Sequence, residues 1–231
     1  MKNLSKLFAL GALALPITSY AADLTVSVQN LTQGVYFTPV LAVAHDSETQ
    51  LFTPGQAASL ALQEMAEGGS LAGLIAQSEA VGANYAHTEG LTAPGAMGEI
   101  SLTNTAGNSS LSLVAMILPS NDGFIGLDDW VIPEQPGTYT VYLNAYDAGT
   151  EANDEIRGGG AIGVPGMPVP PPLEALIGNG GTGVSSVENN NTVHIHRGSI
   201  GDEDMEAGIS DITSSKHRWL NPIAKVTINV N

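Results

Sequence analysis

Acidic residues gather in two segments that could hold a hard cation. Asp122, Asp128 and Asp129 follow one apolar run, and Asp147 and Glu151 follow another. Calcium takes six to eight oxygen ligands at about 2.3–2.6 Å, and loops at the end of a sheet can supply carboxylates and carbonyls together. Asp, Asn and Gly also populate ordinary turns for local backbone reasons. The pattern alone leaves a calcium site and plain turns both open.

The second acidic segment does not form an EF-hand, the best-known calcium loop. An EF-hand starting at Asp147 would need glycine at its sixth position and a bidentate glutamate at its twelfth. Ala152 and Gly158 stand there instead. Any calcium site must therefore be assembled from separate loops.

A histidine pair offers a different metal chemistry. His194 and His196 are two positions apart in an expected strand, so both rings should face one side, a spacing that can hold a transition metal. His217 could add a third nitrogen. Two surface histidines more often belong to a polar sheet face, and the supporting hydrogen bonds of a metal site are not identifiable from the sequence. A second metal stays an open alternative.

Catalytic motifs are missing from the chain. There is no Gly-x-Ser-x-Gly elbow, no His-Glu-x-x-His helix and no phosphate-binding loop. We expect a protein that is not an enzyme. Two alternatives stay open, a carbohydrate-binding β-sandwich and a hydrolase with an unrecognised carboxylate site, because paired acids about 5–10 Å apart in a fold leave no sequence signature. Only two Trp and six Tyr are present, which disfavours a sugar-stacking cleft.

Alternation of apolar and polar residues predicts the strands that must position these groups. It occurs at 24–30, 100–102, 111–114, 139–143, 193–196 and 225–230. Few helices of crossover length separate these strands, which favours a mostly β fold, an antiparallel β-sandwich with long loops at 158–172 and 178–191. Asp122 and Asp147 can then share an ion only if the 121–136 connection crosses the molecule.

One or two short helices are expected between the first strands. Residues 56–67 contain no Gly or Pro and are followed by Gly68 and Gly69, as at a helix C-terminus. We expect this helix to pack on the sheet through Leu60, Ala61 and Met65, because an isolated helix of this length is marginal in water. A second short helix is expected at 71–77.

The first 21 residues predict a cleaved signal peptide. Lys2 and Lys6 precede the apolar stretch 7–17, and the small residues Ser19 and Ala21 mark a cleavage site. The remaining 22–231 is expected to form a single secreted or periplasmic domain without a membrane span. With no cysteine and a formal net charge of −16, the chain has no disulfide and is a poor partner for nucleic acid.

Two motifs resemble the spondin domain family, whose members include F-spondin and mindin. The segment 119–128, PSNDGFIGLD, is similar to the family's PSPDWFVGVD, and 147–151, DAGTE, is similar to its DAGTD. Segments at 37–39, 55–59, 66–69 and 221–228 also resemble the family, so the likeness covers nearly the whole chain after residue 21.

The resemblance implies an extracellular adhesion or matrix module with one calcium ion at the loop end of a β-sandwich. It places the calcium ligands at Asp122, Asp147 and Glu151, with Glu99 as a fourth candidate. Its partner would be an extracellular protein or surface. This chain departs from the family at Glu151, where Asp is usual, at Gly123, where an aromatic residue is usual, and in lacking the family's cysteine.

Overall fold

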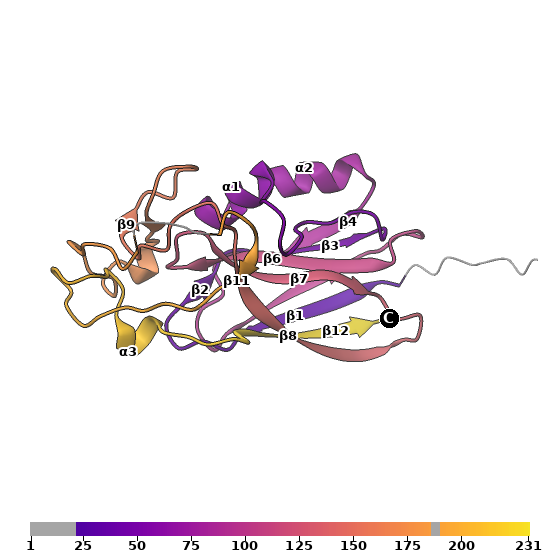
Figure 1. Cartoon of the computed structure of the whole chain (residues 1–231). Coiled ribbons are helices and arrows are strands. Elements are labelled where there is room, and N and C mark those ends of the chain that lie inside the picture. The colour runs from indigo at the N-terminus through magenta and orange to yellow at the C-terminus, as the bar shows by residue number, and fades with distance from the viewer. Residues whose placement is uncertain (1–21, 186–189) are drawn as a thin grey trace, which may run out of the picture.

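A ten-stranded sheet forms the body of the protein, and helices cover one of its faces (Figure 1). The structure is a computed structural model that describes residues 22–185 and 190–231. The expected signal peptide at 1–21 lies outside the described residues. The main path of the sheet is β4-β3-β6-β7-β8-β12-β1-β5. Its strands are β1 (Leu24–Asn30), β3 (Leu41–His45), β4 (Asn84–His87), β5 (Met97–Leu102), β6 (Ser110–Leu118), β7 (Gly123–Val131), β8 (Gly137–Asp147) and β12 (Ala224–Val230).

Shorter elements complete the fold. Two short strands join the sheet at its side, β2 (Tyr36–Phe37) on β6 and β11 (His194–Ile195) on β8. Every pairing within this sheet is antiparallel. The terminal strands of the path, β4 and β5, contact each other, so the sheet nearly closes on itself. The expected mostly β, antiparallel, sandwich-like fold is confirmed.

Strand β6 is buried on both faces and separates two hydrophobic cores. Its residues Leu111, Leu113, Ala115 and Ile117 point into the space enclosed by the curled sheet, where they meet β1, β8 and β12. The alternate residues Val114, Met116 and Leu118 point outward into a second core under the helices. Because successive side chains of a strand face opposite ways, one strand serves both cores.

Helix α1 (Leu60–Gly68) closes the second core. The side chain of Ser59 accepts a 3.1 Å hydrogen bond from the N–H of Leu62, which fixes the helix start four residues later than expected from the sequence. Gly69, at φ 71°, ends the helix in the left-handed conformation. Ala61 and Met65 are buried as expected, but Leu60 is 65% exposed. The expectation for Leu60 was wrong, because the inward face begins at Ala61 and Leu62.

Helix α2 (Ala72–Ala80) follows directly and is somewhat longer than the expected 71–77. It packs against α1 and β4 (Figure 1). In the described part of the chain, no helix is long and apolar enough to cross a membrane.

The main departure from expectation is β7, which occupies the segment read as a carboxylate-bearing loop. Phe124, Ile125 and Leu127 are buried, so the segment has enough apolar residues to form an interior strand. Asp128 and Asp129 lie where the β6–β7 register shifts, and Asp129 adopts a positive φ of 46°. They belong to a β-bulge rather than to a loop.

The segments between β8 and β12 gather at one end of the sheet, the left end in Figure 1. The expected loop at 158–172 contains a short parallel pair, β9 (Arg157–Gly158) with β10 (Met167–Pro168), and the 3₁₀ helix η1 (Pro171–Leu173). The expected loop at 178–191 has no strand or helix in its described residues, and a short helix α3 (Ser214–His217) precedes β12.

Candidate metal centre

Asp122 and Asp147 lie at the same end of neighbouring strands. Asp122 immediately precedes β7, and Asp147 is the last residue of β8. The two strands are antiparallel, and Gly123 is the register partner of Asp147. Asp122 and Asp147 could lie together only if the segment 121–136 crossed the molecule. Strand β7 makes this crossing: it runs from Asp122 to the far end of the sheet, and β8 runs back to Asp147.

Asp122 is fully buried, and only one of its two carboxylate oxygens accepts hydrogen bonds from the described residues. Its Oδ2 accepts hydrogen bonds from the Thr150 N–H at 2.8 Å, the Thr150 hydroxyl at 3.2 Å and the Glu151 N–H at 3.2 Å. Its Oδ1 is buried and accepts no hydrogen bond from the described residues. Burial, followed by the negative charge of Asp147, raises the pKa of Asp122 to about 8 despite the three hydrogen bonds.

Asp147 is 1% exposed and held by its own turn. Its Oδ1 accepts a 2.8 Å bond from the Gly149 N–H, and its Oδ2 accepts one from the Asn153 side-chain amide. The Nε2 of His194 lies 3.6 Å from the same Oδ2. Gly149 has φ 71°, and a Cβ there would stand 2.6 Å from the Thr192 nitrogen, so the turn requires glycine.

Glu151 has its backbone beside Asp122 and its side chain directed away from it. Its Oε2 accepts hydrogen bonds from the Asn121 amide and the Gly166 N–H, both at 3.2 Å, while its buried Oε1 has no hydrogen-bond partner among the described residues. Burial raises the pKa of Glu151 to about 7, and the nearby charges of Glu67 and Asp154 add to the increase.

Glu99 lies apart from the other three predicted ligands. It is exposed on β5 and stands level with Thr140 of β8 through the pairings β5–β1, β1–β12 and β12–β8. Asp147 lies seven residues farther along β8 than Thr140, roughly 23 Å at about 3.3 Å per residue. We therefore leave Glu99 out of the site.

The histidines are engaged separately. The Nδ1 of His194 bonds to the Thr192 carbonyl at 2.7 Å. The Nδ1 of His196 accepts the Gly198 N–H, and that of His217 accepts the Thr213 N–H, both at 3.0 Å. Burial lowers the pKa of His196 to about 3, so this ring is neutral.

The His196 ring also explains one departure from the family motif. A Cβ on Gly123 would stand 3.3 Å from the His196 Cδ2 and 2.8 Å from the Ser120 Oγ. The ring therefore takes up space that a larger side chain at Gly123 would need.

The two aspartates form a carboxylate pair rather than a complete metal cage. Within residues 22–185 and 190–231, no three His, Asp or Glu side chains are arranged as they would be around a metal ion. A cation here would take the remaining ligands from backbone carbonyls and water, as calcium commonly does. The two buried carboxylates repel one another, and a cation would offset this repulsion.

Sequence reasoning missed three polar residues around Asp147 and Glu151. Asn121 lies inside the recognised motif, and Asn153 follows the second motif by two positions, so proximity to the motifs was an available signal. Glu67 lies in the segment 66–69, which also resembles the family, so a similar signal was available. It is a fully buried acid in the last turn of α1, where the helix dipole disfavours negative charge.

The fold and the paired aspartates define an antiparallel β-sheet protein with an acidic loop end. The family model of the spondin N-terminal domain, Spondin_N, matches residues 29–155, more than half of the chain. The chain therefore belongs to the spondin N-terminal domain family. No curated protein matches the sequence. The matched segment includes Asp122, Asp147 and Glu151 but not β12, which pairs with β1 and β8 inside the same sheet.

Proposed function

We propose that this protein is a secreted, non-enzymatic module that binds one calcium ion and attaches to an extracellular protein or surface. The observation that carries the calcium proposal is the Oδ1 of Asp122, a buried carboxylate oxygen without a hydrogen-bond partner among the described residues, next to Asp147. Burying a carboxylate with unused acceptor capacity is costly unless a cation or proton balances it.

Asp122 and Asp147 would hold the ion, while the Glu151 side chain, which bonds to Asn121 and Gly166, would support the turn beside them. The role of the bound ion is structural. It would neutralise the repulsion between the two aspartates and join the loop before β7 to the loop after β8. A ligand that binds only the native state stabilises that state.

Secretion and attachment are supported by the family and by composition. Without cysteine, no disulfide can hold the long loops, and a bound metal ion is another way to do so. The net charge of −16 favours binding of a cation. Family membership supports an extracellular role, and the attachment partner is proposed only as a protein or surface, because function resides in sites carried by a fold.

Calorimetric titration of the metal-free protein with calcium tests the binding proposal. We expect the wild type to bind one ion and Asp122→Asn to bind at least about tenfold more weakly, because the site loses charge without losing volume. Glu99→Gln is the matched control, since it removes an exposed carboxylate on a distant strand and should bind calcium like the wild type. Absence of calcium binding by the wild type would leave the family and the fold without this function.

A further inference from the structure

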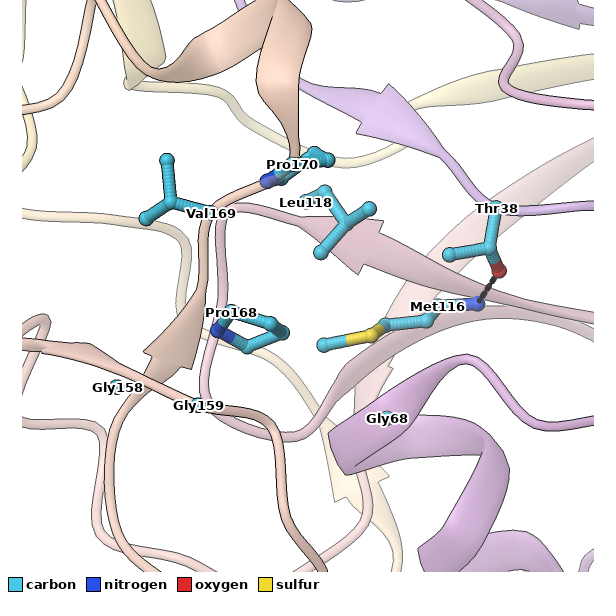
Figure 2. Close-up of a pocket in the computed structure, with 9 residues that line it drawn as sticks. All are labelled: Thr38, Gly68, Met116, Leu118, Gly158, Gly159, Pro168, Val169 and Pro170. Atoms are coloured by element: carbon cyan, nitrogen blue, oxygen red, sulfur yellow. Dashed lines mark hydrogen bonds between the residues drawn. The ribbon is translucent and has the colours of Figure 1, made fainter.

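An uncharged hollow of about 380 Å³ lies where α1 meets the segment after β9 (Figure 2). We name residues 158–170 the Gly-Pro loop. One wall belongs to this loop, and the opposite wall belongs to α1 and the sheet. The only side-chain hydroxyl in the lining is that of Thr38, which already accepts the Met116 N–H at 3.0 Å. The lining residues are Thr38, Gly68, Met116, Leu118, Gly158, Gly159, Pro168, Val169 and Pro170.

Two buried carboxylates hold the Gly-Pro loop in place. The Gly163 N–H donates to the Oε2 of Glu67 at 2.6 Å, and the Gly166 N–H donates to the Oε2 of Glu151 at 3.2 Å. Glu67 belongs to α1 and directly precedes Gly68, which lines the hollow. Hydrogen bonds to carboxylates are stronger than neutral ones. These two contacts therefore add to the backbone bond from the Met167 N–H to the Ile156 carbonyl at 2.7 Å.

Glu151 touches the Gly-Pro loop and the aspartate pair at once. Its backbone N–H donates to the Oδ2 of Asp122 at 3.2 Å, while its side chain accepts the Gly166 N–H. The Asn121 amide donates to the same Oε2 of Glu151. Glu151 therefore links the Asp122 carboxylate to the Gly166 backbone through one hydrogen bond on each side.

Movement of Gly166 must move the wall of the hollow. A Cβ on Gly158 would stand 2.6 Å from the Gly166 Cα, so the two backbones touch without intervening side chains. Gly166 has φ 120°, which favours glycine at this crossing. Gly158 itself lines the hollow.

We propose that cation binding at Asp122 and Asp147 fixes the wall of the hollow through Glu151. This inference rests on the proposed calcium function. With a cation, the Asp122 carboxylate keeps its bonds to the Thr150 and Glu151 N–H groups, and Glu151 stays directed at Gly166. Without it, Asp122 and Asp147 repel one another when both are charged, which loosens the turn at 150–151, and the Gly-Pro loop loses one of its two carboxylate anchors.

Residue-resolved amide hydrogen exchange by NMR reads this coupling directly, with calcium or with EDTA. We expect EDTA to speed exchange at the Gly166 amide by about tenfold, the size expected for losing one charge-assisted bond. The internal control is the Gly181 amide, which donates to the Asp211 carboxylate at 2.8 Å and not to Asp122, Asp147 or Glu151. Its exchange should not respond.

The variant Glu151→Gln should abolish the calcium response at Gly166, while Glu99→Gln should retain it. Calorimetry on the same samples separates the two proposals. Calcium binding without any change at Gly166 would overturn the coupling and leave the calcium function intact. Absence of calcium binding in the wild type would overturn both. If Glu151→Gln does not fold, the exchange rates of the wild type in calcium and in EDTA still test the coupling.

Discussion

Arg157 and Asp211 are 54 positions apart, yet the Asp211 carboxylate accepts a 2.7 Å hydrogen bond from the Arg157 backbone N–H. The other oxygen of Asp211 accepts the Gly181 N–H at 2.8 Å. One buried carboxylate thus joins three separate segments of the loop region that follows β8.

We expect Asp211→Asn to destabilise the protein by about 2–3 kcal/mol, because an amide cannot accept both bonds as a carboxylate does. Urea unfolding followed by fluorescence measures the change. The control is Glu174→Gln, which removes an exposed ion pair with Arg157 and should cost less than about 1 kcal/mol. Equal losses in the two variants would contradict a special role for Asp211.

Calcium should raise the melting temperature of the wild type. At a hundredfold excess over the dissociation constant, binding adds about 2.7 kcal/mol, or about 5–10 °C for a domain of this size. Scanning fluorimetry with calcium and with EDTA checks this, and Asp147→Ala should show no difference between the two conditions. A calcium shift that persists in Asp147→Ala would place the ion elsewhere.

The stabilisation by calcium should grow with pH. The pKa values of Asp122 and Glu151 are raised in the folded protein, to about 8 and about 7. The stability that their protonated forms contribute is full below the unfolded pKa values and is lost as pH rises through the folded ones.

Metal-free protein should therefore lose stability relative to calcium-bound protein between about pH 4 and about pH 8. Melting temperatures measured in EDTA and in calcium at each pH give the difference. In EDTA, the melting temperature of Asp122→Asn should depend less on pH than that of the wild type. A difference that stays constant across this range would argue against a buried carboxylate pair.

Helix α1 should depend on Leu62 and not on Leu60. Leu62 is 1% exposed, so Leu62→Ala should cost about 2–5 kcal/mol through lost burial and a cavity. Leu60→Ala, in the adjacent exposed position, should change stability by no more than about 0.5 kcal/mol. Chemical denaturation distinguishes them, and similar costs would mean that the helix face is rotated from the one described.

The turn after β8 should require glycine at position 149. Gly149 and Gly82 both have positive φ, 71° and 73°, but only Gly149 is crowded by backbone. Gly82→Ala should cost about 1–2 kcal/mol for the left-handed backbone. Gly149→Ala should cost more and weaken calcium binding, measured by thermal unfolding and calorimetry. Equal effects would show that crowding at Thr192 is relieved by a small shift.

The sequence predicted best those strands that have one solvated face. The runs at 24–30 and 225–230 alternate cleanly and form β1 and β12 with nearly the expected bounds. Strands β3 and β6 are buried on both sides, so alternation is weak or absent, and β3 was missed. Strand β7 was missed because Asp128 and Asp129 look like loop residues, whereas they lie in a β-bulge.

For the candidate site, local motifs identified Asp122, Asp147 and Glu151, but not the direction of each side chain. For Glu151, the direction depends on hydrogen bonds from Asn121 and Gly166, which lie 30 and 15 positions away in the sequence. Glu99 was misplaced because a short sequence likeness on a strand carries no information about distance across the sheet. Contacts between remote segments were beyond reach of the sequence alone.

The place of β12 between β1 and β8 has a consequence for the order of folding. Strand β1 begins at Leu24, and its partner β12 ends at Val230, so the sheet joins residues about 200 positions apart. Closing so long a loop costs entropy before any contact forms, and folding slows as contacts become more distant in sequence. During synthesis, the edges of β1 and β8 that β12 will cover stay open until the last strand has left the ribosome. The sheet is therefore complete only after β12 has been synthesised.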